Sequence, residues 1–241
     1  MNKTISKKKL LHLTKFHVRS TYYYLFIITG ILLFNLLIAV LITSLDNTGE
    51  SGSGSLDSVT LVHSFILGIV FFYSTFKFAL LNGVSRRTYY LSSLLYLVIY
   101  SFFFTVITSI TIVIAEAVTN TFTIYSLMYG YNFISMFIWL FLACLFFELL
   151  GWLISCVFYR TYKKARLIIS VSLLLVIPIF VFINYLSNGA FGISVLNFIS
   201  AIFGFNSTIP NPFIAMVTLL VLSLILAGSI FLLVRKAGIR E

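Results

Sequence analysis

The chain of 241 residues is 61% hydrophobic and only 9% charged, whereas a soluble domain is about a quarter charged. A soluble fold of this length could not cover so much apolar surface with polar groups, so the composition excludes a soluble protein and indicates an integral membrane protein. The net charge of +10 does not indicate a nucleic-acid partner, because basic residues in membrane proteins set topology and contact anionic lipid.

The N-terminal residues 1–20 alternate basic and apolar side chains in the stretch KKKLLHLTKFHVR. Such a pattern predicts an amphipathic helix at the membrane interface, with its apolar residues in the lipid and its basic residues toward phosphate groups. A disordered basic tail is the alternative. His12 and His17 have no nearby carboxylate or thiol, so we expect no metal site here.

Residues 21–241 are predicted to form a single transmembrane domain of the all-α class with six helices. The apolar runs lack the alternation of membrane strands, and each has the length of about 20 residues that crosses the hydrocarbon core. The predicted spans are 22–45, 59–80, 90–115, 133–158, 167–186 and 213–234.

The 16 lysines and arginines all fall on alternate connections between these spans. They are Lys3, Lys7, Lys8, Lys9, Lys15 and Arg19; Lys77, Arg86 and Arg87; Arg160, Lys163, Lys164 and Arg166; and Arg235, Lys236 and Arg240. By the positive-inside rule this face is cytoplasmic, which places both termini in the cytoplasm and requires an even number of spans.

The connections on the other face are neutral or acidic. The first, 46–58, contains Asp57 and the stretch SGSGS and is predicted to be a flexible linker. The third, the predicted outer hairpin 187–212, is apolar and uncharged, and glycines interrupt it before Pro210 and Pro212. Apolar irregular backbone favours a re-entrant helical hairpin covered by protein, and a simple interfacial helix is the alternative.

Catalytic chemistry is poorly represented in this sequence. It contains neither an HExxH nor a GxSxG motif and no Walker A motif, so we predict no catalytic residue, no metal site and no ATP hydrolysis in this chain.

Cys144 and Cys156 lie about 18 Å apart on one predicted helix and cannot form a disulfide with each other. Glu148 lies within the fourth span, where a charged carboxylate costs much free energy because the membrane interior does not solvate it. We interpret it either as a substrate-path or gating residue or as a structural hydrogen bond to a neighbouring helix.

The connection 77–89 contains FALLNGVSRRTY. Asn82 and Gly83 predict a turn, and Ser85 predicts the N-cap of a helix that begins at Arg86. Two interpretations fit: a tight basic turn between two spans, or a short helix that docks on a cytoplasmic partner.

Taken together, the six spans, the basic N-terminal helix and the LLNGVSRR segment resemble type 2 ABC transporter permeases. More narrowly, they resemble the small permeases of Gram-positive bacteria that export peptides, including phenol-soluble modulin and bacteriocin-type exporters. In that family the corresponding loop carries the coupling helix, which docks on the ATPase subunit, and a re-entrant outer hairpin precedes the last span.

The resemblance implies a transport subunit in the bacterial plasma membrane, with ATP and Mg²⁺ bound by partner ATPase subunits and no cofactor in this chain. It implies a second permease chain, identical or paralogous, with an interface along the first and fifth spans, and export of an amphipathic peptide or other hydrophobic substrate. The candidate coupling segment comprises Asn82, Gly83, Val84, Ser85, Arg86 and Arg87. The alternative function is a stand-alone channel or secondary transporter that needs no ATPase.

Overall fold

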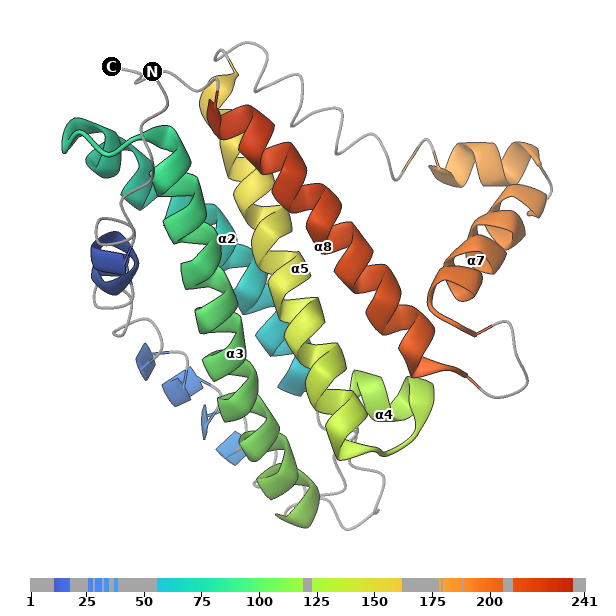
Figure 1. Ribbon diagram of the computed structural model, residues 1–241. Helices are drawn as coiled ribbons and strands as arrows, with labels where there is room; N and C mark the ends of the chain where they lie inside the picture. The colour runs from blue at the N-terminus through green and yellow to red at the C-terminus, as the bar shows by residue number, and fades with distance from the viewer. Residues whose placement is uncertain are drawn as a thin grey trace.

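The computed structural model describes residues 11–17, 26–27, 29–31, 33–34, 37–38, 56–118, 123–161, 178, 180–187, 189–205 and 210–235. The regular structure of these residues is entirely helical (Figure 1). The elements are α2 (Leu56–Leu81), α3 (Arg86–Val118), α4 (Ile124–Tyr129), α5 (Phe133–Arg160), α7 (Ala190–Ile202) and α8 (Pro212–Arg235). Residues 11–17 form a further short helix.

Four of these helices, α2, α3, α5 and α8, are long and apolar enough to cross a membrane. They cover the predicted spans 59–80, 90–115, 133–158 and 213–234 and extend each by only a few residues. The all-α class is therefore confirmed for the described part of the chain, and the four long apolar helices agree with a multi-pass membrane protein. The predicted spans 22–45 and 167–186 lie largely outside the described residues.

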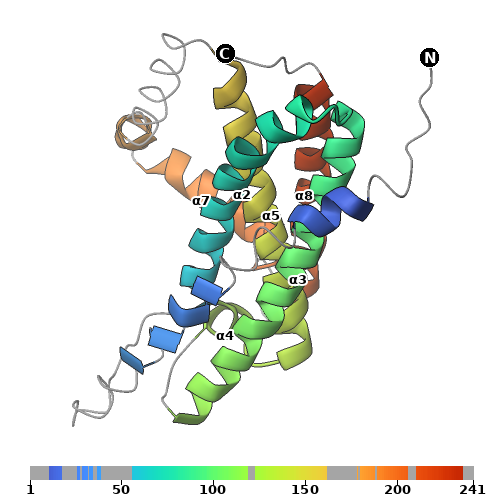
Figure 2. The same cartoon turned by 90° about the vertical axis from the view of Figure 1, so that its left-hand side faces the viewer.

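Helix α5 lies at the centre of the bundle, where it contacts α2, α3 and α8 (Figures 1 and 2). Helices α2, α5 and α8 run in the same direction, and α3 runs in the opposite direction at one side of the bundle. Figure 2 also shows helix 11–17, in blue, lying across the first part of α3.

Two glycines set the close approach of α2 and α5. A Cβ atom added to Gly68 would overlap the backbone oxygen of Glu148, and one added to Gly151 would overlap the backbone oxygen of Phe65. Nearby, the Ser155 hydroxyl donates to the Ile69 carbonyl oxygen at 3.0 Å. Small residues of this kind let membrane helices pack backbone against backbone, because lipid gives no hydrophobic force that would press them together.

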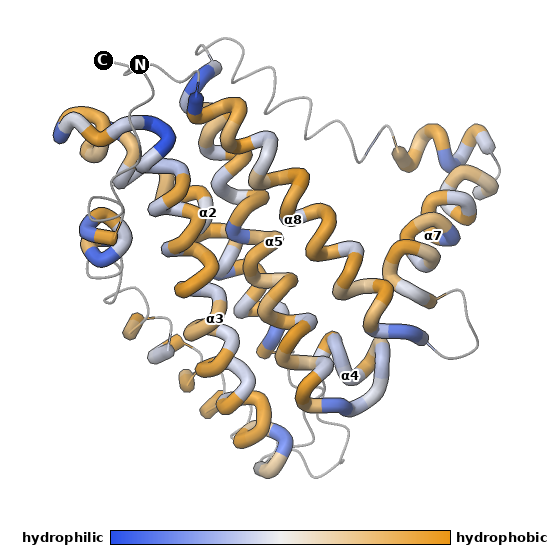
Figure 3. The backbone as a smooth tube through the Cα atoms, viewed as in Figure 1, coloured by the Kyte–Doolittle hydropathy of each residue, from blue (hydrophilic) through white to orange (hydrophobic). Residues whose placement is uncertain are grey.

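Hydrophilic segments lie mainly near the ends of the long helices (Figure 3), and the basic residues gather at one of these ends. There α2 ends, α3 begins, and α5 and α8 end in Arg160 and Arg235. The opposite end carries Asp57 in the first turn of α2 and Glu116 in the last turns of α3. Within the described bundle, the charge separation expected from the sequence is therefore present along the helix axes. We call these ends the basic end and the Asp57 end.

The predicted outer hairpin 187–212 contains one described helix, α7, which contacts α8 and follows a sharp bend after the helix Phe180–Leu186. Phe180–Leu186 and Ala190–Ile202 meet at 118° and form either a broken span or a re-entrant loop. Asn184 closes the bend, since its Oδ1 accepts from the Gly192 amide at 2.8 Å. The bend falls near the predicted start at 187, so the first helical arm lies upstream of the predicted hairpin.

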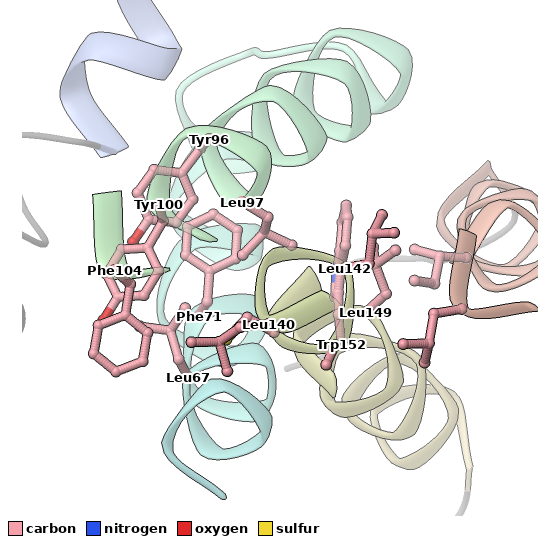
Figure 4. Close-up of a cluster of buried hydrophobic side chains, with 14 of the residues drawn as sticks. Leu67, Phe71, Tyr96, Leu97, Tyr100, Phe104, Leu140, Leu142, Leu149 and Trp152 are labelled. Atoms are coloured by element: carbon pink, nitrogen blue, oxygen red, sulfur yellow. The ribbon is translucent and has the colours of Figure 1, made fainter. Parts of the chain in front are cut away.

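Figure 4 shows part of the apolar core, which α2, α3 and α5 build together. Phe71 from α2 stacks on Tyr96 from α3 with ring centroids 4.7 Å apart. Trp152 from α5 is fully buried and stacks on Tyr90 at 5.8 Å. These aromatic contacts fill the half of the core that lies toward the basic end.

Candidate functional site

The coupling segment follows α2 without a break in hydrogen bonding. The Gly83 amide donates to the Leu80 carbonyl oxygen at 3.0 Å, and the Val84 amide donates to the Ala79 carbonyl oxygen at 3.0 Å. This pair of bonds is a Schellman motif, which needs a left-handed residue after the helix. Gly83 supplies it with a φ of 71°, a conformation that glycine adopts without strain.

Ser85 then begins α3 as its N-cap. Its Oγ accepts from the Thr88 amide at 3.2 Å and lies 2.8 Å from the Thr88 hydroxyl oxygen. The predicted N-cap and the predicted helix start at Arg86 are therefore confirmed. Only residues 82–85 connect the two spans, so the segment is a tight turn. The segment forms no helix separate from α2 and α3, because Arg86 and Arg87 already belong to the first turn of α3, and its docking on a partner stays a prediction.

All six residues of the coupling segment are at least partly exposed at the basic end. Arg86 also has a structural contact, because its Nη1 donates to the Arg235 carbonyl oxygen at 3.1 Å. A cation is favourable at the C-terminal end of a helix, where carbonyl groups lack helical partners. The Tyr90 hydroxyl, one turn further along α3, donates to the Ala227 carbonyl oxygen at 2.9 Å. The segment is thus attached to α8 as well as to α2 and α3.

Glu148 is fully buried where α5 packs against α2 and α3. The Ser101 hydroxyl of α3 donates to its Oε2 at 2.8 Å. The predicted hydrogen bond to a neighbouring helix is therefore present. The other carboxyl oxygen, Oε1, has no hydrogen-bond partner among the described residues. A structural role explains one oxygen of the carboxyl and leaves the other to be explained.

A column of buried polar side chains continues from Glu148 to the Asp57 end, and we call it the polar seam. Its members besides Glu148 are Thr60 and Ser64 of α2, Ser101, Thr105, Thr108 and Ser109 of α3, and Cys144 of α5, all at most 1% exposed. The Thr60 and Thr108 hydroxyls lie 3.3 Å apart. Ser64 and Thr105 lie beside the Cys144 thiol, which is a weak hydrogen-bonding group. The Ser109 hydroxyl has no partner in the described part of the chain.

Sequence reasoning missed the polar seam, although a signal was available. Ser101, Thr105, Thr108 and Ser109 recur at the spacing of one helix face in the predicted third span.

Beside the polar seam, the His63 Nε2 and the Tyr100 hydroxyl oxygen are 2.8 Å apart.

The seam is closed by Asp57 and α4 at the Asp57 end of the bundle. The Oδ2 of Asp57 accepts from the backbone amides of Ile124 at 2.6 Å and Tyr125 at 3.4 Å, which are among the first amides of α4. Thr123 and Ser126 add a capping box at the same place. The prediction that Asp57 lies in a flexible linker is wrong, because Asp57 is 1% exposed in the first turn of α2.

Helix 11–17 packs on the bundle through polar residues. Thr14 and His17 are buried, and the Thr14 hydroxyl donates to the Ser92 carbonyl oxygen at 3.5 Å. The His17 ring meets Phe71 edge-on with centroids 5.1 Å apart. Burial lowers the pKa of His17 from 6.5 to about 4. Leu11 is left 61% exposed, on the face where the sequence predicts contact with lipid.

Comparison with known proteins identifies no relative: no protein family, no curated protein and no solved structure matches this chain. The resemblance to type 2 ABC transporter permeases therefore stays a prediction. Among the described residues, no group of three or more His, Cys, Asp or Glu side chains is placed to hold a metal ion.

Proposed function

We propose that this chain is the transmembrane permease subunit of an ATP-driven exporter in a bacterial plasma membrane. In this proposal the chain has six spans with both termini in the cytoplasm and works with a second permease chain. ATP is hydrolysed by separate ATPase subunits, and the cargo is an amphipathic peptide or another hydrophobic substrate. The observation that carries the proposal is the coupling segment, a hydrogen-bonded and exposed basic turn at the basic end of the bundle.

The contacts of the coupling segment suit the transmission of movement. A partner that displaces it pulls on α2 through the Schellman bonds and on α3 through the Ser85 cap. The displacement also reaches α8 through the bonds of Arg86 and Tyr90 to its backbone. Because α5 packs against all three helices, the whole described bundle responds to a force applied at one turn.

Charge reversal at Arg87 tests the proposed contact with an ATPase. Arg86 is unsuitable, because its replacement also breaks the bond to α8. We expect Arg87→Glu to reduce the ATPase subunit that co-purifies from native membranes by at least about tenfold, since a desolvated charge pair at an interface contributes several kcal/mol. The matched control is Lys77→Glu, an equally exposed charge reversal near the same end, which should retain the partner.

The readout is ATP hydrolysis by the purified complex together with mass spectrometry of its subunits. Size-exclusion chromatography of each variant shows that it is folded. If wild-type protein from native membranes brings down no ATP-hydrolysing subunit, the proposal fails. It fails equally if Arg87→Glu and Lys77→Glu retain the partner to the same extent.

The second candidate is a stand-alone channel or secondary transporter, and the buried Glu148 favours it. Ionisable residues inside membrane bundles commonly mark ion or proton pathways. The two candidates differ in their energy source. Transport by the purified chain alone in proteoliposomes, driven by an ion gradient without ATP, would support the second candidate and contradict the first.

A further inference from the structure

Glu148 has no opposite charge beside it in the described part of the chain. The groups beside its carboxyl are Ser101 and Tyr100 of α3 and Cys144 of its own helix. On α2, Gly68 lies against the backbone carbonyl group of Glu148. The nearest described basic residue on α5, Arg160, is about 18 Å away along the helix. An unpaired carboxylate in such a place is far more costly than a neutral carboxylic acid.

The hydrogen bonding of the carboxyl fits the neutral acid. The Ser101 hydroxyl donates to Oε2, so the acid proton belongs on Oε1, which is the oxygen without a partner. An O–H donor that is fully buried needs an acceptor, and an ordered water is the usual one when the protein supplies none. Oε1 therefore needs a water or a neighbouring hydroxyl that can also carry its proton away.

The polar seam supplies such groups as a continuous column toward the Asp57 end. Toward the Asp57 end, Thr105 and Ser109 follow Ser101 on α3 at one-turn steps of about 5.4 Å, and Ser64 and Thr60 follow in the same way on α2. Toward the basic end, the buried Leu97 lies between Ser101 and the next buried hydroxyl on that face of α3, Ser93. The stacked pairs Phe71–Tyr96 and Tyr90–Trp152 also fill the core there. Hydroxyl groups that both donate and accept can relay a proton with bridging waters, whereas packed aromatic rings exclude water.

We propose that Glu148 is a proton-binding site at the middle of the bundle that exchanges its proton with the Asp57 end through the polar seam. The ligand is a proton, delivered as water-borne hydronium or taken up by hydroxide, and no covalent bond other than O–H forms or breaks. The inference does not depend on ATP-driven export, because it concerns the interior of this chain alone.

Infrared spectroscopy of the purified full-length chain tests this directly. The C=O stretching band of a buried carboxylic acid is identified by its loss in Glu148→Gln. Its shift in D₂O then reports the rate of proton exchange at this one group. We expect Thr105→Val, which removes a seam hydroxyl at nearly constant volume, to slow the exchange at least tenfold.

Two control variants make the test specific. Thr111→Val on the same helix removes a hydroxyl that bonds only its own helix, at the Ile107 carbonyl oxygen, and should leave the rate unchanged. Ser93→Ala removes a buried hydroxyl on the side toward the basic end and should also leave it unchanged. If Ser93→Ala slows exchange and Thr105→Val does not, the proposed direction is wrong.

Carbodiimide labelling supplies an independent readout, because dicyclohexylcarbodiimide reacts with protonated carboxyls in apolar surroundings. The acid proton moves to a carbodiimide nitrogen, and the carboxyl oxygen adds to the central carbon to form the adduct. We expect mass spectrometry of peptides to find the adduct on Glu148 of the wild type. The adduct should persist when Na⁺ is added at constant pH. The absence of both the adduct and the carboxylic acid band would overturn the proposal. Protection by Na⁺ would overturn it in favour of a cation site.

Discussion

Glu148 is held in the bundle interior by backbone packing as much as by its own hydrogen bond. Its peptide unit lies directly against Gly68, and the Ser101 hydroxyl then reaches the carboxyl from α3. Both contacts depend on residues that are small enough to admit a neighbouring helix. The position of the only carboxyl at this depth of the described bundle is therefore decided by residues that carry no charge themselves.

Replacement of Gly68 by alanine should destabilise the protein. The added methyl group overlaps the Glu148 backbone oxygen, which has no flexible side chain that could move away. Overpacking of this kind typically costs about 1–3 kcal/mol, and here it also separates α2 from α5. Gly228→Ala on α8 is the matched control, because nothing lies within 4 Å of its added Cβ. Thermal unfolding in detergent should show a lower midpoint for Gly68→Ala only, and equal midpoints would contradict the packing argument.

At the scale of elements, the described chain uses helix caps from distant residues. Asp57 of α2 accepts from the first amides of α4, and Arg86 of α3 donates to the last carbonyl group of α8. The first amides of α4 and the last carbonyl group of α8 have no partner within their own helix, and these two contacts supply one. The elements are therefore joined at their ends as well as along their faces.

Helix 11–17 should leave the bundle as the pH falls. Its docked His17 has a pKa of about 4, whereas an undocked histidine has its ordinary value of 6.5. Since the undocked state binds more protons, docking keeps its full strength above pH 6.5 and weakens as the pH falls toward 4. The maximum loss is about 3 kcal/mol.

Spin labels at Leu11→Cys and Leu81→Cys measure this docking, because both positions are exposed. Distances between the labels should be narrowly distributed at pH 7.5 and broad at pH 4. The variant His17→Phe, which cannot be protonated, should keep the narrow distribution at both pH values. An unchanged wild-type distribution at pH 4 would show that His17 does not control docking.

At the scale of the whole molecule, charge is separated along the bundle axis. Basic side chains gather where α5 and α8 end, and the acidic residues Asp57 and Glu116 lie at the other end. This arrangement follows the positive-inside rule if the basic end is cytoplasmic. The proposed ATPase contact requires the same orientation.

Labelling of intact cells tests that orientation. We expect a membrane-impermeant maleimide to label Tyr131→Cys, which is 62% exposed at the Asp57 end, and to reach Arg87→Cys only after permeabilisation. The native Cys144 and Cys156 are free thiols but buried, so their background reaction should be low. Labelling of Arg87→Cys in intact cells would place the basic end outside and remove the basis of the ATPase proposal.

The sequence by itself determined the elements whose signals are local. Four spans and their ends followed from hydropathy, because a helix in lipid needs about 20 consecutive apolar residues wherever it packs. The Ser85 cap and the turn at Gly83 followed from residues only a few positions apart. The tertiary structure alone decided which polar groups meet. Asp57 reaches α4, Glu148 meets Ser101, and His17 contacts the ring of Phe71 only because helices far apart in the sequence pack together. Such pairings depend on the relative rotation and depth of two helices, which no local pattern in one helix encodes.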